Sequence, residues 1–228
     1  MSDDELFRAA QRGDVGTARR CLEQLLQEGA PPDVFRLALN VAIWNDHGEI
    51  VREIVRRVGR RLVHELDTWE RYLFLSARRD SATVAGVLIQ CKRGLSRHAP
   101  DFDTILHLAL HNGSAATAAV LIPHVTGFGR TLALTIAAHF GQGRVVRALI
   151  RCGVGVNRSD YFQQTALHCA AQCARTQVVK QLLWFKAEIQ ARNAWGQTPL
   201  DVATTAGHVA TAGVLRRFAA KENEETTA

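Results

Sequence analysis

The segment GQTPLDVATTAGH, residues 196–208, decides the fold. Thr198 is suited to cap a helix, because its hydroxyl can accept a free backbone N–H. Pro199 fits the first helical position, where a backbone N–H would be unpaired anyway. Gly207 follows at the point where a helix end needs left-handed backbone. The segment therefore predicts a short, capped helix that ends in a turn.

The same pattern recurs along the chain at a nearly constant period. Thr165 opens the copy TALHCAAQCA one period before Thr198, and Leu132 opens another copy one period earlier. Four further copies start at Thr104, Arg71, Leu37 and Asp4, and among all these steps only the one from Thr104 to Leu132 is clearly shorter. A period of about 33 residues, kept over most of a chain, is typical of a solenoid of stacked units.

Each unit combines two kinds of helical pattern. Pairs of small residues follow the capping position, and small side chains let neighbouring helices approach closely. These pairs are Ala9/Ala10, Ser76/Ala77, Ala137/Ala138 and Ala170/Ala171. A wider apolar stripe follows in each unit, as in Val178, Val179, Leu182 and Leu183. The sequence therefore predicts an all-α fold of paired antiparallel helices.

Each unit resembles the ankyrin repeat: a short tip, then TPLHxAA, then a turn centred on glycine, then an apolar VVxxLL helix. The resemblance covers roughly residues 2–220 and implies an ankyrin-repeat solenoid with short hairpin-like tips. It predicts one domain over residues 1–220, followed by a disordered tail at 221–228. The seven repeats are expected at about 2–31, 32–65, 66–98, 99–126, 127–159, 160–192 and 193–220.

Two repeats depart from the pattern. The third has RYLF at 71–74 in place of TPLH, and Asp80 in place of the turn glycine. The connection from Pro123 to Thr131 is about five residues shorter than elsewhere, which predicts a shortened hairpin there.

The resemblance also implies a binding surface, made of the tips and the exposed ends of the first helices. Carried over position by position, it predicts partner contacts at Trp44, Trp69, Arg78, Arg79, Phe102, His111, Asn112, His139, Phe140, Tyr161, Phe162, Trp195 and Gln197. With Phe35 and Phe128, nine of the 15 aromatic residues fall on positions that the repeat exposes. Aromatic and Arg side chains dominate binding energy at protein interfaces, so this row is the predicted interface. The alternative for Phe35, Trp69 and Phe102 is that their tips fold inward, because they lack the glycine that the family prefers.

Charge adds a second set of expectations. Lys and Arg total 28 against 22 Asp and Glu, which favours an acidic partner. The stretch REIVRRVGRRLVH at 52–64 has two interpretations. It is either a nuclear-import signal or acidic-ligand patch, or a solvated helix face whose cations suit the helix C-terminus.

Cysteine and histidine patterns give no sign of a metal or disulfide framework. The five cysteines are odd in number and contain no CxxC pair, which fits a reducing compartment. His107 and His168 occupy the TPLH histidine position, where the resemblance implies hydrogen bonds between repeats. No phosphate-binding loop, nucleophile elbow or HExxH motif is present, and a repeat stack offers no closed pocket. We therefore expect no enzyme activity, no cofactor and no small-molecule substrate.

The sequence thus predicts a protein-interaction scaffold, an adaptor or inhibitor that binds another protein through its tips and concave face. One alternative is a nuclear transcriptional regulator resembling inhibitor-of-NF-κB proteins, and another is a host-mimicking effector, with a basic surface contributing. Direct nucleic-acid binding is not expected. The acidic start MSDDELFRAA is unlike a signal peptide, and no apolar stretch reaches about 18 residues, so no membrane association is expected. The expected location is the cytoplasm, the nucleus or both.

Overall fold

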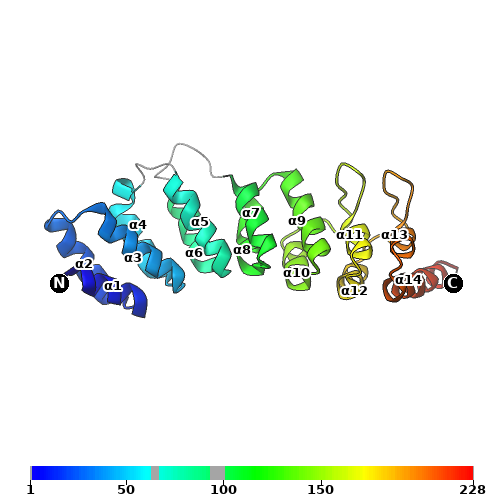
Figure 1. Ribbon diagram of the computed structural model, residues 1–228, viewed down its shortest axis with the longest axis horizontal. Helices are drawn as coiled ribbons and strands as arrows, with labels where there is room; N and C mark the ends of the chain where they lie inside the picture. Colours follow the sequence, from blue (N-terminus) through cyan, green and yellow to red (C-terminus); the bar gives the residue numbers. More distant parts are fainter. Residues whose placement is uncertain (1, 63–66, 93–100, 228) are drawn as a thin grey trace. The chain divides into compact units, whose positions relative to one another are not determined.

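The computed structural model describes residues 2–62, 67–92 and 101–227, and within these ranges the regular elements are helices (Figure 1). Contacts between residues divide the chain into two compact units, Met1–Ala109 and Leu110–Ala228. We call them unit 1 and unit 2 and describe each by itself. The expectation of a single domain over residues 1–220 stays a prediction.

Unit 1 is built from helix pairs. Its helices are α1 (Ser2–Arg12), α2 (Val15–Gln27), α3 (Pro32–Trp44), α4 (Gly48–Leu62), α5 (Asp67–Arg79), α6 (Ala82–Lys92) and α7 (Phe102–His111), which crosses the unit boundary. The first helices α1, α3 and α5 each pack on their own second helix, and α3 also packs on both α1 and α5. The second helices α2, α4 and α6 pack on one another in the same order.

Unit 2 repeats this arrangement. Its elements are α8 (Ala115–Leu121), the 3-10 helix η1 (Ile122–His124), α9 (Gly127–Phe140), α10 (Gly143–Arg151), α11 (Ala166–Gln172), α12 (Thr176–Trp184), α13 (Pro199–Thr205) and α14 (Val209–Thr227). The first helices α9, α11 and α13 form one layer, and the second helices α8, α10, α12 and α14 form another. The predicted all-α fold of paired helices is therefore confirmed.

A left-handed residue ends the first helix of each pair. The predicted glycines at 13, 113, 141 and 207 have φ angles of 80°, 73°, 76° and 74°. Where glycine is missing, Asp46, Asp80 and Ala174 take the same conformation, with φ of 60°, 53° and 55°. Asp80 thus replaces the turn glycine of the third repeat without loss of the turn, because aspartate tolerates left-handed backbone better than most residues.

The side chain that follows this turn connects neighbouring helix pairs. His47 Nε2 donates a hydrogen bond to the carbonyl of Gln11 at 3.2 Å, and His208 Nε2 donates to the carbonyl of Gln172 at 2.9 Å. Arg175 Nε makes the equivalent bond to the carbonyl of His139 at 3.0 Å. Each bond satisfies a carbonyl at the end of a first helix, which has no partner within its own helix.

The predicted core positions are buried. The four pairs of small residues lie between first helices, and all eight side chains are buried. Val178, Val179, Leu182 and Leu183 are buried between second helices, as the apolar stripe predicts. Thr198 caps α13 as predicted: its hydroxyl accepts the N–H of Asp201 at 3.2 Å, and Asp201 Oδ2 accepts the N–H of Thr198 at 2.9 Å.

The tips differ between early and late repeats. The helices α3, α5, α7 and α9 have 13, 13, 10 and 14 residues, whereas α11 and α13 have seven each. The first helices of the earlier repeats start upstream of the expected position, because a capping residue or a proline lies at that upstream point. Pro32 opens α3, the Asp101 carboxylate accepts the N–H of Thr104 at 3.1 Å, and the Thr126 hydroxyl accepts the N–H of Gly129 at 3.0 Å.

This early start corrects several expectations about tip residues. Phe35, Trp69, Phe102 and Phe128 lie inside helices rather than in hairpin tips. Phe35 is completely buried, so its expected exposure was wrong and the inward alternative is right. The short connection at 123–131 contains η1 and the start of α9, and only Val125 and Thr126 separate these two helices.

The tail also differs from its expectation. We expected residues 221–228 to be disordered, but α14 continues as far as Thr227. Residues 221–227 contain no glycine or proline that would stop a helix, and lysine and glutamate favour helix. In the described ranges, no helix combines the length and apolarity needed to cross a membrane.

Opposite substitutions at equivalent turns test the role of left-handed backbone. We expect Ala174→Gly to raise the free energy of unfolding by about 0.5 kcal/mol, because relief of the left-handed strain exceeds the added chain entropy. Gly207→Ala should lower it by about 1 kcal/mol, since an added Cβ meets nothing within 4 Å and the penalty is purely conformational. Urea unfolding followed by circular dichroism measures both changes, and shifts of the same sign would contradict this account.

Candidate functional site

Unit 2 has two hairpin tips, each turned by one polar side chain. Asp160 Oδ1 accepts the N–H groups of Phe162 and Gln164 at 2.9 and 2.8 Å. Asn193, one repeat further along the chain, accepts the N–H groups of Trp195 and Gln197 at 3.1 and 2.9 Å. Both side chains mimic a backbone turn, which is why Asp and Asn are favoured in such loops.

The two tips hold three aromatic rings together, and we call Tyr161, Phe162 and Trp195 the tip cluster. The N–H of Ala194 donates to the carbonyl of Phe162 at 2.9 Å, which joins the two tips. The rings of Phe162 and Trp195 are stacked at 5.7 Å, and Tyr161 meets Phe162 edge-on at 5.6 Å. The three residues remain 87%, 51% and 62% exposed, so the cluster is a contiguous surface of exposed aromatic rings.

A buried histidine holds these two tips in place. His168 Nε2 donates to the carbonyl of Gln197 at 3.0 Å, and its Nδ1 lies 2.9 Å from the Thr165 hydroxyl. Only a neutral imidazole can donate from Nε2 and accept at Nδ1, and burial lowers the pKa of His168 from its ordinary value. The predicted bond between repeats is thus confirmed for His168, whereas His107, expected to play the same part, is exposed.

The ends of the first helices in unit 2 carry a second group of predicted residues. His111, Asn112 and His139 are exposed. The exposed Phe140 ring meets both imidazoles edge-on, with its centroid 5.6 Å from that of His111 and 5.3 Å from that of His139. His139 Nδ1 is 3.2 Å from the Cys173 sulfur of the next repeat. These side chains form a mixed aromatic and polar surface.

In unit 1 the structure brings together two predicted residues. The Arg79 guanidinium lies over the Trp44 ring at 4.8 Å, a cation–π contact between neighbouring repeats, and Trp44 stays half exposed. Arg78 is also exposed.

The other predicted site residues are less available. Phe102 is half-buried at the start of α7, and Gln197 is half-buried, with its backbone held by His168 and Asn193. Trp69 lies in α5, but its side chain is outside the described residues, as is that of Phe128.

One strongly exposed aromatic residue, Trp184, was not predicted to belong to a surface site. Trp184 ends α12 and is 74% exposed, and its ring meets the half-buried Phe185 edge-on at 4.8 Å. Neither residue lies at a tip or on a first helix. Trp184 lies one repeat from both Arg151 and Arg217, so it holds a repeat position at which the neighbouring repeats have arginine. That position could have indicated from the sequence that Trp184 is exposed.

Two of the five arginines in the basic stretch at 52–64 are paired with acidic groups. Arg57 bonds to Glu23 at 3.0 Å and also to Glu53, while Arg52 bonds to Glu49 at 2.9 Å. The interpretation as a solvated, ion-paired helix face is therefore favoured for these two arginines. The side chains of Arg60 and Arg61 lie outside the described residues.

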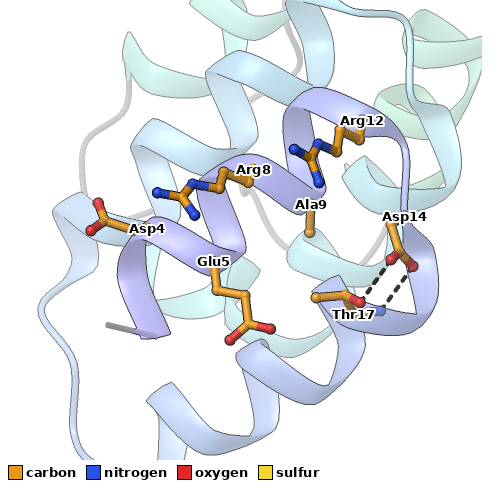
Figure 2. A pocket seen from close by; sticks show the side chains of 7 residues that line it. All are labelled: Asp4, Glu5, Arg8, Ala9, Arg12, Asp14 and Thr17. Carbon is orange, nitrogen blue, oxygen red and sulfur yellow. Dashed lines mark hydrogen bonds between the residues drawn. The ribbon is translucent and has the colours of Figure 1, made fainter.

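A pocket of about 420 Å³ lies on α1 and the start of α2 (Figure 2). Its wall contains Asp4, Glu5, Arg8, Ala9, Arg12, Asp14 and Thr17. Asp14 accepts the N–H of Thr17 at 3.0 Å and its hydroxyl at 2.7 Å. The charges in this wall are mixed, unlike the apolar lining of most small-molecule sites.

Comparison with known proteins agrees with this geometry. A family model described as ankyrin repeats (3 copies) matches residues 134–225. The ankyrin repeat and SOCS box protein 5 of Bos taurus is 40% identical over 72 residues, which cover 32% of this chain and 22% of that protein. Inversin of Canis lupus familiaris is 34% identical over 79 residues, 35% of this chain and 7% of inversin. The potassium channel KOR2 of Oryza sativa subsp. japonica is 39% identical over 61 residues, 27% of this chain and 8% of the channel.

Residues 134–225 thus match ankyrin repeats, and these relatives support an ankyrin repeat protein. It spans less than a quarter of the length of each of these relatives. Ankyrin repeats imply a role in protein–protein interaction, and the family is generally a non-enzymatic interaction module.

Because His168 is neutral in the folded chain, we expect the free energy of unfolding to depend on pH in a specific way. Because its pKa is lowered in the folded chain, the unfolded chain binds the proton first as the pH falls below 6.5. The stabilisation from His168 is therefore complete above pH 6.5 and is lost progressively below it. We expect the difference in unfolding free energy between wild type and His168→Gln to narrow as the pH falls from 7.5 towards about 5.

Urea unfolding at several pH values measures this difference. His107→Gln is the matched control, and because His107 is exposed we expect only a small difference in unfolding free energy from wild type. A gap between wild type and His168→Gln that stays constant over this range would refute the neutral assignment of His168.

Proposed function

We propose that this chain is an adaptor or inhibitor that holds a partner protein against the tip cluster and the exposed ends of α9 and α11. The observation that carries this proposal is the tip cluster itself, three exposed rings on two hydrogen-bonded tips. Large aromatic side chains supply most of the binding energy at protein interfaces. Contiguous exposed apolar patches on soluble proteins mark interaction sites.

The tips are rigid in a way that favours binding. Asp160 and Asn193 turn the two loops, and His168 connects them through buried hydrogen bonds. A surface already held in its bound conformation loses little entropy when a partner docks. The cluster is therefore well suited to tight binding over a small area.

The chemistry of the surface supports recognition rather than catalysis. Asp160 and Asp201, the carboxylates beside the tips, are engaged in turn and cap hydrogen bonds. The backbone hydrogen bond and hydroxyl of Thr198 keep the pKa of Asp201 below its ordinary value, so this carboxylate is a poor general acid or base near neutral pH.

The remaining predicted contacts extend the surface. We assign His111, Asn112, His139 and Phe140 to the partner-facing ends of the first helices in unit 2. In unit 1, Trp44, Arg78 and Arg79 form a second contact area, to which Trp69 and Phe102 belong by repeat position. All five cysteines are free thiols, which supports a reducing location such as the cytoplasm or nucleus.

A triple substitution tests the tip cluster. Proteins would be captured from a cell lysate, at low and moderate salt, with three tagged chains. These are the wild type, the triple variant Tyr161→Ala/Phe162→Ala/Trp195→Ala and a Trp184→Ala control. Proteins retained by wild type and the control but lost by the triple variant would then be purified, and their affinities measured by calorimetry. Loss of three interface anchors should weaken binding at least about 100-fold.

The outcomes separate the competing functions. Binding that survives the triple substitution would show that the tip cluster is not the interface. Binding that vanishes with moderate salt in the wild type would instead favour contacts with acidic groups, as expected for a regulator resembling inhibitor-of-NF-κB proteins.

A further inference from the structure

The second helices of unit 2 present an exposed face that is independent of the tip cluster. The helices α10, α12 and α14 start at Gly143, Thr176 and Val209, one repeat apart, and α12 packs against both of its neighbours (Figure 1). Residues at equal distances from these starts therefore occupy equivalent positions. Their buried sides face the core, so their opposite sides form one surface, which we call the outer face.

The outer face is rich in cations. In α10, Arg144, Arg147 and Arg151 recur at helical spacing and are exposed, on the side opposite the buried Val145 and Leu149. The equivalent exposed positions of the next two helices add further cations. These are Lys180 and Arg217, and Lys221 lies about one helical turn beyond Arg217 in α14.

Two strongly exposed apolar side chains lie among these cations. Trp184 is 74% exposed and is the ninth residue of α12, the position that Arg151 holds in α10 and Arg217 holds in α14. Val209, at the start of α14, is 82% exposed. The outer face thus combines positive charge with apolar groups that contact solvent.

The helices α10 and α12 contain no acidic residue that could balance the positive charge of the outer face. Unit 1 has 16 basic and 16 acidic residues, whereas unit 2 has 12 basic and six acidic ones, so the net charge of +6 belongs to unit 2. In unit 1, Arg57 on the second helix α4 bonds to Glu23 and Glu53. Among residues whose side chains the structure describes, no carboxylate pairs with the six outer-face cations. Acidic residues return in α14 only from Glu222 onward.

We propose that the outer face binds the surface of an anionic lipid bilayer. Each lysine or arginine close to such a surface contributes about 1 kcal/mol of attraction, and six of them act together here. A tryptophan ring is amphipathic and prefers the level of the lipid headgroups, where Trp184 would be inserted. Three adjoining helices spread the cations over an area rather than along one line, which matches a flat target. The expectation of no membrane association rested on the lack of a long apolar stretch, which a surface-bound face does not need.

A nucleic-acid strand fits these observations less well. Single strands are bound by grooves that follow the phosphate backbone, with several aromatic rings for successive bases. Trp184 is the one strongly exposed ring on these three helices in the described residues: Phe218 of α14 is only 36% exposed, and Val209 has no ring on which a base could stack. The apolar groups therefore favour the bilayer. The outer face and the tip cluster share no residue, so one surface can act without the other.

Vesicle binding by the full chain tests this proposal. Co-sedimentation at physiological ionic strength would compare vesicles of phosphatidylcholine alone with vesicles that also contain phosphatidylserine. We expect binding only to the phosphatidylserine vesicles. Arg147→Glu/Arg151→Glu should reduce this binding at least about 100-fold, since four units of charge change at the surface. Trp184→Ala should reduce it several-fold.

A matched control separates a local surface from overall charge. Arg12→Glu/Arg56→Glu changes the net charge equally, at two exposed arginines of unit 1, and should keep most of the binding. Circular dichroism confirms that each variant is folded. The proposal is overturned if wild type does not bind phosphatidylserine vesicles, or if both double variants lose binding equally. It is also overturned if single-stranded oligouridine binds more tightly than the vesicles and competes for Arg147 and Arg151.

Discussion

The left-handed turn between the two helices of each pair is the constraint on which the rest of the structure depends. It occurs at residues 13, 46, 80, 113, 141, 174 and 207, at nearly equal steps except for the shorter one between 113 and 141. A single residue in this conformation ends the first helix and sends the chain back as an antiparallel second helix. The side chain after the turn, as in His47 and His208, then bonds to the preceding pair. The turn therefore sets both the geometry within a pair and the register between pairs.

The place where each first helix starts decides which repeats can carry tips. Early starts at Pro32 and Thr126 extend α3 and α9 through the segments that would otherwise form hairpins. Late starts at Thr165 and Thr198 leave the preceding residues free to form loops, which Asp160 and Asn193 turn. The tip cluster lies in unit 2 for this reason. The ring of Phe35 would be exposed only if it lay in a loop, but Phe35 lies in α3 and is buried.

Stacking of helix pairs also explains how two separate surfaces arise in unit 2. Each pair buries its sides against its neighbours, while its tip and the back of its second helix remain free. Rings collect at the tips and cations collect on the backs of α10, α12 and α14. In unit 1 the second helix α4 has cations too, but two of them, Arg52 and Arg57, form ion pairs with Glu49, Glu53 and Glu23. The same architecture thus supports different surface chemistry in the two units.

The sequence by itself determined the features that depend on local pattern. Period, turn glycines, small core residues and the Thr198 cap are each set by neighbours close in the chain, and all are found where they were predicted. The exposure of Tyr161, Phe162 and Trp195 also followed from repeat position. Tertiary structure alone decided the burial of Phe35, the stacking of Phe162 on Trp195 and the pairing of Arg57 with Glu23. The last two contacts join residues about one repeat apart, and the burial of Phe35 depends on how far α3 extends. The sequence pattern of a single repeat predicts neither the contacts with the next repeat nor the length of its helix.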